Sequence, residues 1–246
     1  MAAIAALFDP VTFRLIGATG ITGGWRCWEV GAGGPTVSGW LADAVGPTGS
    51  VVATDLDLSR FGEPPHGVTA QVHDVTTDPP PGAAFDLIHA RLVLVHLPER
   101  TAVVTTLAGA LRPGGWLVVE DADPALQPLA CVDERLPDEV LANRIRAGFR
   151  MLLAERGADL AFGRTLPRLL RGVGLVDVTA EAWFPVAGRD GAVVERVTVE
   201  QVGADLVARG LATRDEIERH LENLTAGRLD VATAPLVSAR GRRPEV

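Results

Sequence analysis

Three carboxylates and a pair of glycines are spaced early in this chain as they would be around one nucleotide-like ligand. Glu29 lies two residues before the turn Gly31-Ala32-Gly33, where glycine permits a tight turn and close approach of the backbone to a ligand. Asp55, about two dozen residues after the turn, suits a carboxylate that accepts both ribose hydroxyls. Asp74, with Val75 beside it, is placed to accept from the exocyclic amine of adenine.

Glu29 distinguishes between two classes of ligand. A carboxylate directly before the turn repels a pyrophosphate, but it suits a ligand that is cationic at that end. S-adenosylmethionine carries an amino group and a sulfonium there, whereas a dinucleotide carries the pyrophosphate. The residues favour S-adenosylmethionine, and an NAD-dependent oxidoreductase, which retains Asp55 but leaves Glu29 unexplained, is the alternative.

Methyl transfer from a sulfonium requires alignment and exclusion of water, and a base helps only when the acceptor atom is protonated. His89, His96 and Asp121 are the candidates for that base, since they follow or end predicted strands. Each has a structural alternative. His89 alternates with apolar residues, as a histidine packed in a strand does. His96 precedes a predicted helix and could cap it or pack against it. Asp121 suits a solvated, capping position in a loop.

Arg91 and two aromatic residues are further candidates. Arg91 either orients an acidic substrate or pairs with Glu120, and the ion pair is the favoured reading. Phe13 and Phe149 line a hydrophobic acceptor pocket if flanking helices close over the sheet; otherwise they belong to the core. Because the chain has no tyrosine, only Trp, Phe and His can supply rings.

The elements that position these residues alternate between strand and helix. Residues 25–30 predict a buried strand, and Pro35 suits the first position of a helix. Residues 50–55 predict the next strand, which completes a right-handed strand–helix–strand unit with parallel pairing. Further predicted elements are strands at 68–73, 85–90 and 116–120 and a helix at 98–111. The sequence predicts an α/β fold: a Rossmann-like, doubly wound, mostly parallel sheet of seven strands with ligands at the carboxyl ends.

Helices are predicted on both sides of this core. Asp9-Pro10 reads as the start of a short helix over residues 11–16, and residues 134–156 have the spacing of a long amphipathic helix. Residues 193–207 are ambiguous between strand and helix because they are rich in valine. Other predicted elements are a helix at 165–170, a strand at 175–186, a helix capped by Thr213 and Glu216, and a closing strand at 236–239.

The composition excludes several classes of function. A net charge of −8, without a long basic run, argues against nucleic acid as a partner. No apolar run reaches the ~20 residues of a membrane helix, and the short apolar N-terminus lacks a basic leader. Two distant cysteines indicate neither a disulfide nor a metal site, so we expect a cytoplasmic protein; a homodimer is left open.

Five segments together resemble the successive motifs of class I S-adenosylmethionine-dependent methyltransferases, in order and at the right spacing. They are Glu29-Val30-Gly31-Ala32-Gly33, Val52-Ala53-Thr54-Asp55, His73-Asp74-Val75, Phe85-Asp86-Leu87-Ile88-His89-Ala90-Arg91 and Leu111-Arg112-Pro113-Gly114-Gly115. The resemblance is strong over residues 25–121, and the remainder looks like actinobacterial small-molecule methyltransferases. One departure is Pro35, which stands where the family usually has a third glycine.

The resemblance implies a role for each matching residue. Glu29, Gly31 and Gly33 would cradle the methionine part of the cofactor, Asp55 would bind the ribose, and Asp74 and Val75 the adenine. Ala90 and Arg91 would line the far side of the cofactor, and Ala32 and Leu56 complete the expected set. Asp57 competes with Asp55 for the ribose, and Asp55 is preferred because it closes the apolar run.

We therefore expect methyl transfer from S-adenosylmethionine to an oxygen or nitrogen atom, with carbon less favoured, of a small molecule in specialised metabolism. S-adenosylhomocysteine would be the product. A non-methylating enzyme or binding protein that uses the same cofactor is a further alternative. The expected domain organisation is a single domain over 1–246, with an N-terminal helical lid (1–24), a cofactor-binding core (25–125) and helical additions (130–160 and 190–226).

Overall fold

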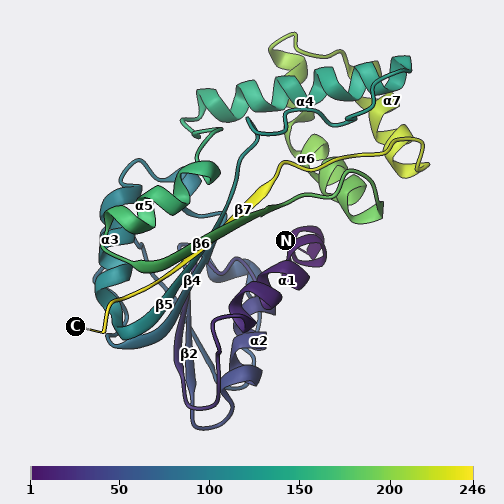
Figure 1. Cartoon of the computed structure of the whole chain (residues 1–246). Coiled ribbons are helices and arrows are strands. Elements are labelled where there is room, and N and C mark those ends of the chain that lie inside the picture. Colours follow the sequence, from purple (N-terminus) through teal and green to yellow (C-terminus); the bar gives the residue numbers. More distant parts are fainter. Residues whose placement is uncertain (1, 246) are drawn as a thin grey trace.

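Seven strands form one mixed sheet in the order β3-β2-β1-β4-β5-β7-β6, in a computed structural model that describes residues 2–245 (Figure 1). The strands are β1 (Arg26–Val30), β2 (Ser50–Asp55), β3 (Val68–Val72), β4 (Phe85–Arg91), β5 (Leu111–Ala122), β6 (Val176–Trp183) and β7 (Leu236–Arg242). The first five strands pair in parallel, whereas β7 runs antiparallel to both β5 and β6. This confirms the predicted Rossmann-like, mostly parallel seven-stranded sheet.

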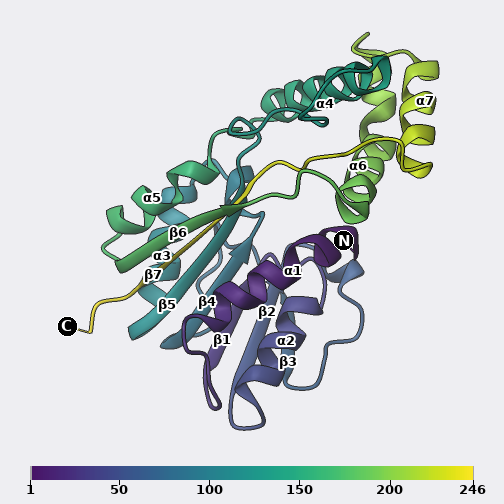
Figure 2. The ribbon, with the colours of Figure 1, turned by 45° about the vertical axis from the view of Figure 1, so that its right-hand side comes forward.

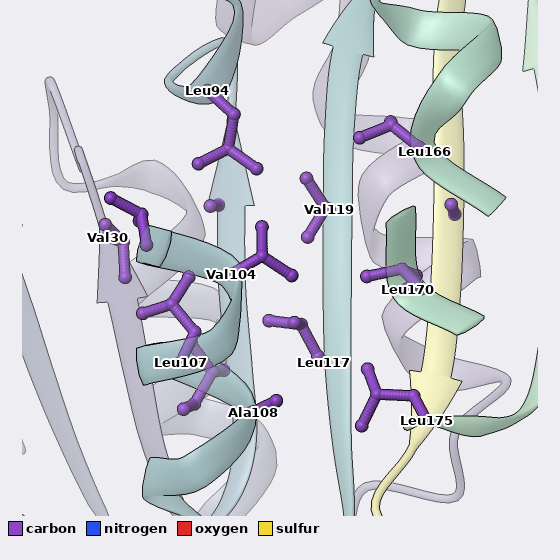
Figure 3. Packing of buried hydrophobic residues seen from close by; sticks show 14 of the residues in the cluster. Val30, Leu94, Val104, Leu107, Ala108, Leu117, Val119, Leu166, Leu170 and Leu175 are labelled. Carbon is purple, nitrogen blue, oxygen red and sulfur yellow. The ribbon is translucent and has the colours of Figure 1, made fainter. Parts of the chain in front are cut away.

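Helices cover both faces of the sheet and one of its ends (Figure 2). They are α1 (Ala2–Gly17), α2 (Thr36–Val45), α3 (Arg100–Ala110), α4 (Pro137–Glu155), α5 (Leu166–Gly172), α6 (Arg189–Ala208) and α7 (Arg214–Thr225), with short 3-10 turns η1 (Leu58–Arg60), η2 (Leu94–His96) and η3 (Gly163–Thr165). Side chains of α1 and α2 share a core cluster on one face of the sheet. Side chains of α3 and α5 pack on the other face, where Figure 3 shows Val104, Leu107, Leu166 and Leu170 against Leu117 and Val119.

Helix α1 is longer than predicted. The prediction that Asp9-Pro10 begins the helix is wrong, because the helix starts at Ala2 and Pro10 lies inside it. A proline within a helix costs roughly 3 kcal/mol. Burial of Leu7 and Phe8 against Leu236 stabilises the turn before the proline and offsets this cost.

Helices α4, α6 and α7 pack together above one end of the sheet, at the upper right of Figure 1. The valine-rich segment that the sequence left ambiguous is helix α6. Its Val199, Val202 and Leu206 recur at helical spacing and bury their side chains against Leu141 and Ile145 of α4. Helix α7 has the predicted capping box: Thr213 accepts from the Glu216 amide at 3.3 Å, and the Glu216 carboxylate accepts from the Thr213 amide at 2.9 Å.

Most other elements differ from prediction only at their ends. Pro35 occupies the position before α2 rather than its first turn, and the strand expected over 175–186 is confined to Val176–Trp183. Conversely, β7 extends to Arg242 because it pairs with β5 along seven residues, and β5 runs from Leu111 to Ala122, longer than predicted at both ends. None of the helices within residues 2–245 has the length and apolarity needed to cross a membrane.

Candidate active site

The conformation of the glycine turn after β1 requires glycine for two reasons. Gly31 and Gly33 have φ of +64° and +60°, a region that side chains disfavour. A Cβ atom on Gly31 would lie only 2.3 Å from Cγ2 of Val93, in the segment after β4. The turn therefore packs directly on the β4–η2 connection, which lies between two of the predicted site residues, Arg91 at the end of β4 and His96 at the end of η2.

A cavity of about 400 Å³ opens beside this turn at the carboxyl ends of β1, β2 and β4. It is lined by Ile4, Glu29, Gly31, Ala32, Gly33, Asp55, Asp57, Arg60, Arg91, Leu92 and His96. The structure therefore brings together the predicted residues Glu29, Asp55, Arg91 and the whole Gly31–Gly33 turn. We call this space the acid-lined cavity.

Glu29 is a buried carboxylate at the base of the acid-lined cavity. Only 3% of its surface is exposed, and its Oε2 has no hydrogen-bond partner within residues 2–245. Burial raises the pKa of Glu29 to about 8, although the Arg91 guanidinium and Ser38 oppose the shift. A cationic group placed here would both supply the missing partner and favour the ionised carboxylate.

Binding of a cationic ligand by Glu29 should release a proton. Near pH 7 the carboxyl of the free protein is mostly protonated because its pKa is about 8, and an ammonium beside it stabilises the ionised form. We expect S-adenosylhomocysteine to release close to one proton per site, measured by calorimetry in buffers of different ionisation enthalpy. Glu29→Gln should bind without this release; an equal release from that variant would contradict the assignment.

Arg91 joins helix α1 to the sheet. Its Nη2 donates to Asp9 at 2.8 Å and its Nη1 to the Thr12 hydroxyl at 2.8 Å, so the predicted pairing with Glu120 is wrong. Glu120 instead accepts from Thr12 at 2.6 Å and Ser238 at 2.5 Å, and His89 Nε2 lies 3.1 Å from it. Burial alone raises the pKa of Glu120, but these partners hold it below its usual value. The unexpected partner Asp9 is available because α1 continues through Pro10.

Asp55 ties the glycine turn to β2. Its Oδ2 accepts from the Gly33 amide at 2.8 Å and its Oδ1 from the Asp57 amide at 3.1 Å. Asp57 is used locally: its carboxylate accepts from the amide and the hydroxyl of Ser59 at the start of η1, and these bonds lower its pKa. Both carboxylates line the acid-lined cavity, and Asp55 also controls the shape of the turn.

Asp55→Ala is expected to weaken cofactor binding by roughly 1.5–3 kcal/mol, the range for a hydrogen bond to a charged group. Asp57→Ala serves as the matched comparison, because it removes a neighbouring carboxylate whose hydrogen bonds remain within η1. Calorimetric titration with S-adenosylhomocysteine measures both. Unchanged affinity in Asp55→Ala, with a loss in Asp57→Ala, would transfer the ribose role to Asp57.

Four predicted cofactor residues do not line the acid-lined cavity. Asp74 accepts from the amide and hydroxyl of Thr76 in the turn after β3, which lowers its pKa, and Val75 packs on the core. Ala90 is buried within β4. Leu56 follows Asp55 with 67% of its surface exposed, so it remains an apolar surface beside the expected ribose site. Their cofactor-binding roles stay predictions.

A second cavity, of about 250 Å³, adjoins the first. It is largely apolar and lies between helix α1, the segments after β4 and β5, and helices α4 and α6. Its lining comprises Ile4, Phe8, Leu92, Val95, His96, Ala122, Pro124, Gln127, Pro128, Arg146, Phe149, Arg150, Leu153, Ala158, Leu160, Gly191, Val194, Glu195, Thr198, Thr233, Ala234 and Leu236. We call it the apolar cavity.

The two cavities share three wall residues: Ile4, Leu92 and His96. Leu92 has φ of +58°, an unfavourable conformation for a residue with a side chain, and its amide donates to the Glu120 carbonyl at 2.8 Å. Strained backbone of this kind concentrates at functional sites. Sequence reasoning missed Ile4 and Leu92, since neither carries a chemical signal.

The two aromatic candidates have different positions. Phe149 of α4 lines the apolar cavity, as one reading of the sequence proposed. Phe13 does not; its ring stacks on Trp40 of α2, with centroids 4.9 Å apart and planes within 4°, and belongs to the core between α1 and α2. Phe8, five residues earlier on α1, lines the cavity instead.

The structure also distinguishes the three candidates for a general base. His96 faces both cavities, and burial lowers its pKa, so the imidazole is neutral near pH 7. His89 is buried in β4 beside Glu120, which is the packed arrangement. Asp121 is fully buried at the end of β5 rather than in a solvated loop, and burial raises its pKa to about 8 although the Leu94 and Val95 amides oppose the shift. It lines neither cavity.

Comparisons with known proteins give the family and the fold. The profile of a family described as "Methyltransferase domain" matches residues 14–180. "Methyltransferase str2" of Strobilurus tenacellus is 34% identical over 56% of this chain and 48% of its own length. Nocamycin O-methyltransferase of Saccharothrix syringae is 28% identical over 96% of this chain and 91% of its own length. The chain spans about half the length of the first of these relatives.

Solved structures share the fold at low sequence identity. Phosphoethanolamine N-methyltransferase 2 of Haemonchus contortus, in complex with phosphomonomethylethanolamine and S-adenosylhomocysteine, superposes with a TM-score of 0.59 at 15% identity. The superposition covers 98% of this chain and 56% of that one. The [4+2]-cyclase SpnF gives a TM-score of 0.54 at 17% identity and covers 96% and 81% of the two chains.

Proposed function

The chain belongs to the class I S-adenosylmethionine-dependent methyltransferases, and on that premise we propose that it methylates an oxygen or nitrogen atom of a small molecule in specialised metabolism. S-adenosylmethionine is the donor and S-adenosylhomocysteine the product. The name of one relative, nocamycin O-methyltransferase, supports the methylation of a small molecule. A cytoplasmic location and a single-domain organisation are part of the proposal.

One observation carries this proposal: the acid-lined cavity and the apolar cavity share a wall of Ile4, Leu92 and His96. The first has the carboxylates for a cationic adenosyl ligand, and the second offers room for an apolar acceptor. In-line methyl transfer needs donor and acceptor in adjoining spaces, aligned and without water between them.

The residues of the acid-lined cavity fit the cofactor. The unpartnered Oε2 of Glu29 would receive its ammonium group, the backbone of Gly31–Gly33 allows close approach, and Asp55 would hold the ribose. When bound, the cofactor supplies an electrophilic methyl group on its sulfonium. These residues would hold it, while Ile4 and Leu92 would exclude water from the shared wall.

His96 is the proposed general base for an acceptor that carries a proton. Its neutral imidazole lies at the shared wall, where a hydroxyl or ammonium of the acceptor would meet the cofactor cavity. The evidence that His89 or Asp121 acts as the base is weaker, because both are buried away from the two cavities.

Calorimetry and a turnover assay test the proposal together. We expect micromolar or tighter binding of S-adenosylmethionine and S-adenosylhomocysteine, and formation of S-adenosylhomocysteine when phenols, amines and hydroxy acids are offered. Absence of binding by either cofactor form would refute it. Binding without turnover across the panel would favour a non-methylating enzyme. A [4+2]-cyclase has the same fold, so this alternative is a real one.

A further inference from the structure

The apolar cavity has a charged side that the methyl-transfer scheme does not use. On helix α4, Arg146, Phe149, Arg150 and Leu153 recur at three- and four-residue spacing, and all four line the cavity. One face of the helix therefore presents two guanidinium groups, one turn apart, to a space that is otherwise mostly apolar.

The first of these arginines is neutralised within the protein. Arg146 donates to Glu195 through Nη2 at 2.5 Å and Nε at 3.1 Å, and its Nη2 also reaches the Ala232 carbonyl at 3.1 Å. Both side chains of the pair are less than a tenth exposed. Arg146 is thus a structural residue with its charge balanced.

The second arginine has no such partner. Within residues 2–245, no carboxylate lies within 4.0 Å of the Arg150 guanidinium, and its buried Nε has no hydrogen-bond acceptor. The buried hydroxyl of Thr233, which lines the same cavity, is also unpartnered in this described part of the chain. Buried polar groups are seldom left unpaired, since each costs about 1–3 kcal/mol.

We propose that Arg150, assisted by Thr233, binds a carboxylate of the acceptor, so that the substrates of this enzyme are compact apolar acids. A guanidinium pairs with a carboxylate through two parallel hydrogen bonds, and the apolar lining suits the body of the molecule. Arg150 does not belong to the wall shared with the acid-lined cavity. The carboxylate is therefore an anchor, and the methylated atom lies elsewhere on the acceptor. This inference rests on the proposed function.

A binding experiment with matched acids and amides tests the anchor. The probes are straight-chain acids from butanoate to decanoate and a series of phenylalkanoates, each paired with its primary amide, in the presence of saturating S-adenosylhomocysteine. We expect at least one acid to bind about tenfold more tightly than its amide, as a charge-assisted hydrogen bond implies. Arg150→Gln should abolish that preference without changing the affinity for S-adenosylhomocysteine.

Arg144→Gln is the matched control, because it removes the same charge from the same helix at an exposed position paired with Glu216. It should retain the preference for the acid. The proposal is overturned if no acid is preferred by the unmodified protein, or if Arg150→Gln retains the preference. Failure of the unmodified protein to bind S-adenosylhomocysteine would instead count against the proposed function.

Discussion

Replacement of Arg146 by methionine is expected to lower the free energy of unfolding by about 3–5 kcal/mol near pH 7, the usual cost of leaving a buried charge unpaired. Glu195 would keep only His220, whose Nε2 lies 3.7 Å away. The pair connects α4 to α6, and His220 extends it to α7. The loss should appear in denaturant unfolding as a shifted midpoint.

The pH dependence of this variant gives a second check. Burial by itself raises the pKa of Glu195, but Arg146 and then His220 lower it to about 2. In the unmodified protein the pair therefore contributes stability above the ordinary pKa of glutamate, and that contribution is lost as the pH falls toward 2. In Arg146→Met the pKa of Glu195 should instead be raised, so the difference between the two proteins should shrink as the pH falls from 8 to about 5.

Two further variants control this experiment. Arg146→Met with Glu195→Leu removes both charges and should recover most of the loss, because an apolar replacement of a buried pair is often neutral. Arg156→Met breaks an exposed pair with Asp205 between the same two helices and should cost less than about 1 kcal/mol. If Arg156→Met lowered the free energy of unfolding as much as Arg146→Met, the stability of these helices would depend on charge in general rather than on the buried pair.

Replacement of His96 by glutamine is expected to lower kcat by about 10²- to 10⁴-fold on an acceptor that loses a proton, the usual contribution of a general base. Binding of S-adenosylhomocysteine should be unchanged within a few-fold, since the proposed cofactor contacts come from other residues. His66→Gln, at an exposed position that lines neither cavity, is the control.

The pH profile separates a base from a residue that only shapes the wall. Burial lowers the pKa of His96, so kcat should rise with pH through that lowered value and level off above it. The acidic limb should vanish in His96→Gln. An unchanged kcat would mean that the acceptor attacks in a form that needs no base, which would remove the catalytic role from His96 but not the proposed methyl transfer.

Much of the acid-lined cavity could be predicted because its residues depend on local signals. Glu29, the glycine turn and Asp55 lie at carboxyl ends of neighbouring parallel strands, and that topology brings such residues to one edge. Asp74 shows the limit of this reasoning. It also follows a strand, but a hydrogen bond to the next turn directs its carboxylate to Thr76.

The acceptor side could not be predicted, because it depends on which helix face meets the sheet. Phe8 and Phe13 are five residues apart on α1 and so lie on different faces of the helix, and only Phe8 reaches the apolar cavity. The contribution of α6 was hidden by its valine content, so Glu195 was not a candidate. The Asp9–Arg91 pair joins residues 82 positions apart, and no local pattern reports such a contact.

The antiparallel strand β7 has a consequence for how this chain folds as it is made. β5 and β6 both form their ladders with β7 rather than with each other. Translation proceeds at about 5–20 residues per second, so roughly 6–23 s separate the emergence of β5 from that of β7. During that interval β5, whose Leu117, Val118 and Val119 are buried in the finished sheet, presents an open edge to other nascent chains. We therefore expect chaperones to act on this sheet edge during synthesis, whereas all residues that line the acid-lined cavity emerge more than a hundred residues before β7.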